Sequence, residues 1–193
     1  MTTPAPTAAA PRGREAVVAA LLDAAGRQLA ARGAAGVSIR SVAAAARVNH
    51  GLVHRHFGSK DALVAAVLDD LAERLAARVA AAPNGAGWLV DPDDVVLDRF
   101  WRILARTILD GGDPAALQRH YPVVAGLVER MVRRGVAEDR ARLAAARITA
   151  FALGWLVFEP FLEAAAGLDP AGRVDRRRTL PAAAERLVDA SGA

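Results

Sequence analysis

The sequence predicts an all-α protein in which a small N-terminal three-helix unit precedes a larger helical region. Ala, Leu, Arg and Val dominate the 193 residues, and apolar residues recur at helical spacing along most of the chain. The alternation of apolar and polar residues that is typical of strands is scarce. The length suffices for one large domain or for a small domain and a larger one, and we expect the second arrangement.

The first helix is expected from Arg14 to Arg32. Its apolar stripe consists of Val18, Leu21, Leu22, Ala25 and Leu29, and Gly33 supplies a C-terminal stop. Residues 1–11 combine proline and small residues without an apolar face, so we predict a disordered arm before this helix.

Residues 36–63 predict two short helices joined by a tight turn. Ser38 can cap the first helix, whose apolar pattern breaks around Arg47, and Asn49 can cap a second helix over residues 50–57. This is the sequence form of a helix-turn-helix. Ser59 then begins a longer helix through about residue 82.

The second short helix is basic and rich in histidine. With Val48, Val53 and Phe57 turned inward, five side chains remain available to a partner: His50, Leu52, His54, Arg55 and His56. A helix of this kind suits the major groove of double-stranded DNA, where its N-terminal residues approach base edges.

The charge distribution supports a nucleic-acid partner. The formal net charge of the chain is +4, but residues 12–60 hold eight basic and two acidic residues, a net charge of +6, which leaves −2 for the rest. A positive lobe attracts phosphates, because Lys and Arg displace condensed counterions. A solvated basic surface without a nucleic-acid partner is the alternative.

Three Asp-Pro pairs divide the C-terminal region, because each places a good N-cap before a residue suited to a first helical turn: Asp91-Pro92, Asp113-Pro114 and Asp169-Pro170. We expect helices at about 93–110, 113–119, 121–134, 137–166 and 179–190. In the longest helix, Pro160 should produce a kink near residues 157–160.

An apolar seam runs along this longest helix. Its members are Ile148, Phe151, Trp155, Phe158 and Leu162, spaced as in a helix that meets another helix. Leu180 and Leu187 of the final helix can cover part of the seam, and a second copy of both helices would complete a four-helix interface between subunits. Packing within one chain is the alternative.

The N-terminal part resembles the tetracycline-repressor (TetR) family of bacterial regulators over about residues 14–68. The residues that carry the resemblance are Leu21, Ala24, Ala25, Leu29, Gly33, Ser38, Val42, Ala43, Val48, Asn49, Gly51, His56, Phe57, Ser59, Lys60 and Leu63. Two positions depart from the family pattern: Arg47 replaces a usual glycine of the turn, and His54 replaces a common phosphate-binding tyrosine. A non-glycine residue is tolerable at position 47 if its φ is negative.

The resemblance implies a function and a set of DNA-binding residues. It implies that Ser38 and Arg40 contact the DNA backbone, that His50 and Leu52 face bases, and that His54, His56 and Lys60 lie at phosphates. Asn49, Gly51 and Arg55 complete the predicted DNA-binding set. The resemblance also implies a homodimer built on the last two long helices, an effector pocket in the C-terminal domain, and repression relieved by ligand.

We predict a largely apolar small-molecule effector. The candidate pocket residues combine aromatic surface with a few polar groups: Phe100, Trp101, Leu104, Thr107, His120, Tyr121, Leu127, Met131 and Trp155. The predicted domains are therefore an arm over 1–11, a DNA-binding helix-turn-helix domain over 12–60, and an effector-binding and dimerisation domain over 61–193.

Other function classes fit the sequence less well. His50, His54 and His56 are close enough in sequence to suggest a metal site, but cysteine is absent from the chain and carboxylates are absent from that helix. No catalytic motif is present, so we expect neither an enzyme nor a cofactor. We expect a cytoplasmic protein without a membrane-spanning run. A helical lipid or small-molecule carrier without DNA binding remains the alternative function.

Overall fold

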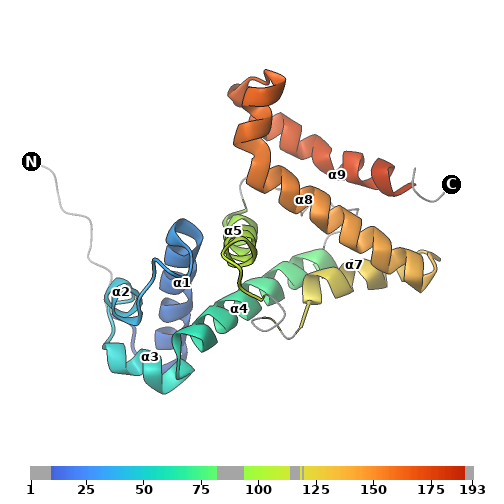
Figure 1. Ribbon diagram of the computed structural model, residues 1–193. Coiled ribbons are helices and arrows are strands. Elements are labelled where there is room, and N and C mark those ends of the chain that lie inside the picture. The colour runs from blue at the N-terminus through green and yellow to red at the C-terminus, as the bar shows by residue number, and fades with distance from the viewer. Residues whose placement is uncertain (1–9, 82–93, 114–117, 119, 190–193) are drawn as a thin grey trace, which may run out of the picture. The chain divides into compact units, whose positions relative to one another are not determined.

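The structure, a computed structural model, describes residues 10–81, 94–113, 118 and 120–189. Contacts divide the chain into two compact units, the first ending at Val67 and the second beginning at Leu68. The described residues form eight α-helices and no strand, which confirms the all-α prediction (Figure 1).

The first unit contains α1 (Arg14–Arg32), α2 (Ile39–Ala45), α3 (His50–Phe57) and the start of α4 (Lys60–Ala81). Its core includes the side chains of Leu21, Ala24, Leu29, Val42 and Val53, each at most 1% exposed. Val53 is the one buried residue of α3, so the rest of that short helix lies at or near the surface. As predicted, α1 ends at Gly33, which has a positive φ of 70°.

Side-chain caps begin the next three helices where the sequence predicts them. The Ser38 hydroxyl accepts the Ser41 N–H at 3.1 Å, and the Asn49 side-chain oxygen accepts the Gly51 N–H at 2.8 Å. The Ser59 hydroxyl accepts the Ala62 N–H at 3.0 Å. Because each cap satisfies a backbone donor that has no partner inside its helix, α2, α3 and α4 start at defined residues.

The turn between α2 and α3 contains a left-handed residue. Arg47 has a φ of +57°, so the condition of a negative φ for a non-glycine residue at this position is not met. The Arg47 N–H donates to the Ala44 carbonyl at 3.1 Å and the Val48 N–H to the Ala43 carbonyl at 3.0 Å. These two bonds close the end of α2 as a Schellman motif, which requires a left-handed residue at this position.

The second unit contains the rest of α4, α5 (Val95–Leu109), α7 (Pro122–Arg133), α8 (Glu138–Ala166), a 3₁₀ turn η2 (Pro170–Gly172) and α9 (Arg173–Asp189). The long helix α8 packs against α5, α7 and α9. The largest buried apolar side chains of α5, α7 and α8 are Leu97, Phe100, Trp101, Ile103, Val123, Leu127 and Ile148. This core holds α8 as the central helix of the unit.

Three predicted C-terminal helices, α5, α7 and α8, lie where the sequence places them. Most of the expected helix at 113–119 lies outside the described residues, and so does the Asp91-Pro92 pair. Asp94 is the observed N-cap of α5. The final helix starts at Arg173 and not at Thr179. Residues 173–178 lack an apolar stripe, so the sequence pattern did not predict a helix there. Ion pairs hold these residues against α8.

Those ion pairs join the buried carboxylates of Glu159 and Glu163 on α8 to arginines of α9. Arg177 Nε donates to Glu159 Oε2 at 2.9 Å, and Arg173 Nε donates to Glu163 Oε1 at 3.0 Å. Arg176 also bonds Glu163, at 2.5 Å. The hydrogen bond from Arg173 lowers the pKa of Glu163 despite the opposing effect of burial, and the same bond raises the pKa of Arg173.

Helix α8 is continuous through Pro160 and changes direction in its C-terminal part (Figure 1). This helix is long enough and apolar enough to cross a membrane, judged by length and composition alone. This finding corrects the expectation that the chain has no membrane-spanning run. Only 28% of its most apolar 18-residue stretch is buried in the protein. Because Glu159 and Glu163 bring ionic contacts into this helix, we interpret its exposed apolar surface as a protein-contact surface.

Replacing Arg47 tests the left-handed turn. Arg47→Val places a β-branched residue at positive φ, whereas Arg47→Gly relieves the strain, and both remove the same side-chain charge. The Val variant should be less stable than the Gly variant by roughly 1–2 kcal/mol in urea unfolding. Equal stabilities would contradict the turn geometry.

Replacing Glu163 tests the ion pairs between α8 and α9. Because the folded-state pKa of Glu163 is lowered, its ionised form stabilises the fold above the unfolded-state pKa, and this contribution disappears as the pH falls through the folded-state value. Glu163→Gln should therefore lower the thermal unfolding temperature at neutral pH, and the difference from wild type should shrink in acid. Glu129→Gln, which removes an exposed carboxylate paired with Arg133, is the control and should have little effect.

Candidate nucleic-acid interface

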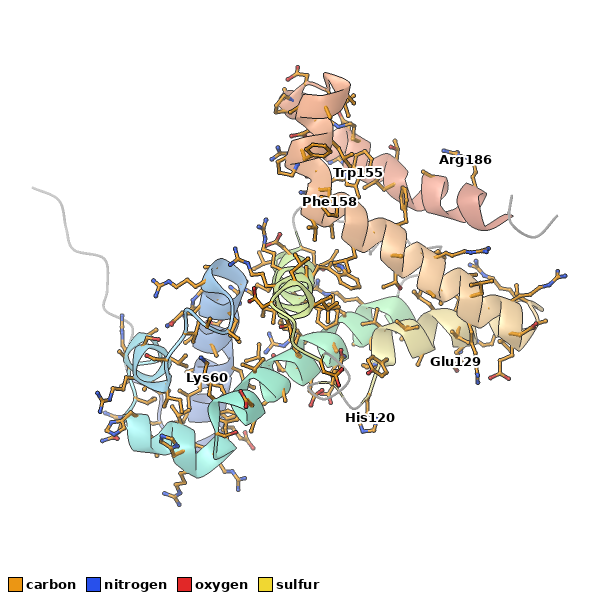
Figure 2. The ribbon with its side chains drawn as sticks, viewed as in Figure 1. Lys60, His120, Glu129, Trp155, Phe158 and Arg186 are labelled. Carbon is orange, nitrogen blue, oxygen red and sulfur yellow. The ribbon has the colours of Figure 1, made fainter. Side chains whose placement is uncertain are left out.

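The predicted DNA-binding residues all lie in the first unit, on the helix-turn-helix and on the residues immediately before and after it. Seven are exposed: Ser38, Arg40, Asn49, His50, Gly51, His54 and Arg55. Leu52, His56 and Lys60 are half-buried. Lys60, labelled in Figure 2, is the first residue of α4. None of the three α3 imidazoles is buried, so the recognition face of α3 is accessible.

His54 holds a specific tautomer at the end of α3. Its Nδ1 lies 3.1 Å from the Gly58 carbonyl oxygen, which can only accept a hydrogen bond. The Nδ1 atom therefore carries a proton, and Nε2 can donate to a phosphate only when the ring is doubly protonated. A tyrosine hydroxyl at this position would donate without a change of charge.

A polar contact that was not predicted from the sequence joins α1 to α2, the first helix of the helix-turn-helix. The Ser41 hydroxyl donates to Gln28 Oε1 at 2.7 Å, and Gln28 Nε2 donates to the Ser41 carbonyl at 3.0 Å. Ser41 also completes the capping box with Ser38. The available signal was Gln28 itself, a polar residue next to the buried Leu29 in the apolar stripe of α1.

The start of α1 lies beside α3 and adds positive charge to this surface. Arg14 lines a hollow of about 440 Å³ together with Arg55 and His56 of α3. Gly13, Val17 and Leu52 complete its lining. The basic surface of the first unit therefore extends beyond the helix-turn-helix.

The nine predicted effector residues are divided between buried and exposed positions and line at least two different hollows. Phe100, Trp101, Thr107 and Leu127 are buried, Leu104, Met131 and Trp155 are half-buried, and His120 and Tyr121 are exposed. A cavity of about 410 Å³ between α5, α8 and α9 includes Trp101. His120 and Tyr121 instead line a shallower hollow between α7 and α8.

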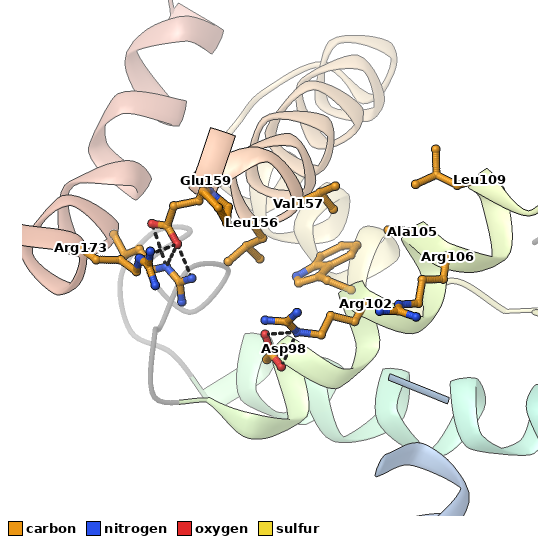
Figure 3. Close-up of a pocket in the computed structure, with 12 residues that line it drawn as sticks. Asp98, Arg102, Ala105, Arg106, Leu109, Leu156, Val157, Glu159 and Arg173 are labelled. Atoms are coloured by element: carbon orange, nitrogen blue, oxygen red, sulfur yellow. Dashed lines mark hydrogen bonds and ion pairs between the residues drawn. The ribbon is translucent and has the colours of Figure 1, made fainter. Parts of the chain in front are cut away.

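The cavity between α5, α8 and α9 carries a basic rim that the sequence analysis did not predict (Figure 3). Arg102 and Arg106 come from α5, and Arg173 and Arg177 come from α9. These arginines are far apart in the sequence, and only the packing of both helices against α8 brings them to one cavity.

The predicted seam on α8 divides between the core and the surface. Ile148 of α8 and Leu180 of α9 are each 4% exposed and are buried within the single chain, whereas Phe158 is 56% exposed. Phe151, Trp155 and Leu162 are half-buried, and the side chain of Leu187 lies outside the described residues. Phe161, which was not predicted, is 67% exposed.

The described residues also bear on the metal-site alternative. Within these parts of the chain, no group of three His, Cys, Asp or Glu side chains is placed to hold a metal ion. His50, His54 and His56 therefore do not form such a three-residue group.

Comparisons with known proteins agree with this site. A sequence model described as "Bacterial regulatory proteins, tetR family" matches residues 21–67. The chain is 41% identical over 182 residues to the HTH-type transcriptional regulator Mb3439c of Mycobacterium bovis and to the HTH-type transcriptional repressor Rv3405c of Mycobacterium tuberculosis. Each comparison covers 93% of this chain and 93% of the relative.

Solved structures share the fold. A transcriptional regulator from Rhodococcus sp. Rha1 matches with a TM-score of 0.63 at 23% identity, over 88% of this chain and 96% of the other. Salmonella enterica GusR matches with a TM-score of 0.61 at 18% identity, over 89% of this chain and 93% of its own. With the close mycobacterial relatives, these matches show that the chain belongs to the TetR family of bacterial regulatory proteins and is a helix-turn-helix transcriptional regulator, not an enzyme.

Proposed function

We propose that the protein is a ligand-responsive repressor that binds a palindromic operator in double-stranded DNA as a homodimer and is released by a small-molecule effector. The observation that carries this proposal is the exposed basic and polar face of α3, a helix capped by Asn49 and anchored by Val53. The name of the mycobacterial relative Rv3405c supports repression. We place the protein in the cytoplasm, where its operator is.

The proposed interface divides its work between two kinds of contact. Arg40 and Lys60, at the starts of α2 and α4, approach phosphates, with Ser38 and the imidazoles of His54 and His56 beside them. His50 and Leu52, near the N-terminus of α3, face base edges. Leu52 offers only an apolar contact, such as one to a thymine methyl group.

Domain roles follow the same division. We assign the arm to residues 1–11, DNA binding to 12–60, and effector binding and dimerisation to 61–193. Helix α4 is continuous across the boundary between Val67 and Leu68, so one helix connects the two units covalently. An effector that binds the DNA-competent and DNA-incompetent states with different affinities shifts the equilibrium between them, whereas equal affinities shift nothing.

The dimer is proposed from the exposed apolar side chains of α8. Phe158 and Phe161 are three residues apart and therefore share one helical face, and both are more than half exposed in the single chain. Exposed apolar patches of this kind are typical of protein contacts, and an isologous interface pairs the same patch on both subunits.

Salt dependence tests the division of labour at the DNA interface. Lys60→Ala and Arg40→Ala should weaken binding to all DNA sequences, and each should reduce the slope of log affinity against log salt by about 1. His50→Ala should instead change the sequence preference and leave the slope unchanged. Fluorescence anisotropy with specific and unrelated duplexes at several salt concentrations measures both effects.

Arg133→Ala is the matched control for these variants, because it removes an exposed cation from α7 in the second unit. It should change neither the affinity nor the slope. If His50→Ala and Lys60→Ala behave alike, the assignment of base and phosphate contacts is wrong.

Charge on the exposed face of α8 tests the dimer. Phe158→Glu combined with Phe161→Glu should convert a dimer into a folded monomer in sedimentation velocity, because a paired interface would bury four carboxylates. Val95→Glu, at a side chain of α5 that is 58% exposed, should remain dimeric. A persistent dimer in the double variant would contradict this interface.

A further inference from the structure

The cavity between α5, α8 and α9 has an apolar lining. Trp101, Ala105 and Leu109 of α5 face Leu156 and Val157 of α8 across a volume of about 410 Å³. Cavities of roughly 300–1,000 Å³ with an apolar lining and a few polar groups are typical of small-molecule sites. The size and lining therefore suit a compact organic molecule.

The rim of this cavity is positively charged. Four arginines line it together with two carboxylates, those of Asp98 and Glu159, and Arg173 is paired with Glu163, which lies outside the lining. Asp98 is engaged by Arg102, whose Nε lies 2.8 Å from both of its carboxylate oxygens, and Glu159 is engaged by Arg177. Among the residues that the structure describes, Arg106 has no acidic partner, so the rim has an excess of positive charge.

One residue of the lining, Trp101, has a buried hydrogen-bond donor without an acceptor. Trp101 is 2% exposed, and its Nε1 atom has no acceptor among the described residues. A buried donor in this state costs about 1–3 kcal/mol. Because this atom is closed off from the cavity, Trp101 contributes the apolar surface of its ring to the lining.

We propose that this cavity binds an amphipathic organic anion, in which an acidic headgroup such as a carboxylate lies at Arg106 and an apolar body contacts Trp101, Leu156 and Val157. The proposal that an anion binds is argued from the cavity alone. Only the role of that anion as the effector rests on the proposed function. A cationic ligand would be opposed by the excess of arginine, and an inorganic anion would leave the apolar lining uncovered.

Calorimetric titration of the full chain with four probes tests the ligand class. Octanoate should bind more tightly than 1-octanol, octylammonium or inorganic phosphate, and its affinity should fall as the salt concentration rises. Equal affinity for octanoate and 1-octanol would overturn the requirement for an anion. Tighter binding of phosphate than of octanoate would overturn the requirement for an apolar body.

Two substitutions place the anion in this cavity. Arg106→Gln should reduce octanoate affinity about fivefold, as expected for a partly exposed ion pair, and leave 1-octanol affinity unchanged. Arg140→Gln, which removes an exposed arginine near the start of α8 outside the cavity lining, is the control and should change neither. An unchanged octanoate affinity in Arg106→Gln would overturn the proposal.

Trp101→Phe separates ligand binding from structural support. The variant keeps an aromatic ring and removes part of the apolar surface that Trp101 contributes to the lining, so it should weaken octanoate binding. A drop in unfolding temperature with unchanged octanoate affinity would show that Trp101 only supports the fold, and would overturn its assigned contact.

DNA binding measured with the same protein distinguishes failure of this inference from failure of the proposed function. If octanoate binds as expected but does not release the DNA, the anion site stands and its role as the effector site is wrong. If octanoate does not bind while sequence-selective DNA binding persists, the anion site is wrong and DNA recognition stands.

Discussion

The structure of the DNA-binding unit depends on how α3 is held. An isolated helix of eight residues is unstable in water, because few backbone hydrogen bonds offset the cost of nucleation. Here Asn49 caps its start, the left-handed residue Arg47 sets the turn before it, and Val53 anchors it in the core. Since one side chain supplies the buried contact, the remaining faces of α3 stay available for a partner. Stability and recognition in this unit therefore depend on the same geometry.

In the second unit, ion pairs place α9 against α8. Buried ion pairs add little net stability compared with apolar packing, but removing one partner leaves a costly unpaired charge. Glu159 and Glu163 therefore favour the arrangement in which Arg173, Arg176 and Arg177 reach them. Two of these arginines also line the cavity, so the contacts that position α9 also determine the charge of the proposed ligand site.

Sequence reasoning succeeded where local chemistry decides the structure. Ser38, Asn49 and Ser59 cap helices through bonds that span two or three residues, so their roles follow from residue type and position. It failed where distant packing decides. The start of α9 depends on carboxylates at least ten residues away, and the φ of Arg47 depends on how α2 closes rather than on the preference of arginine.

The candidate sites show the same contrast. The predicted DNA-binding residues lie close together because they come from one continuous stretch, and most are exposed. The predicted effector residues come from α5, α7, α8 and the segment just before α7. Aromatic residues that form a core have the same spacing as those that line a pocket. Phe100 is therefore in the core, whereas the arginines of α5 and α9 line the cavity.

Footprinting of the purified protein on DNA tests the central claim most directly. We expect selective protection of a palindromic sequence whose two half-sites have centres about 34 Å apart, because two symmetric copies of α3 enter successive major grooves. Uniform protection without sequence preference, or protection of one isolated half-site, would contradict recognition by a symmetric pair of helix-turn-helix units.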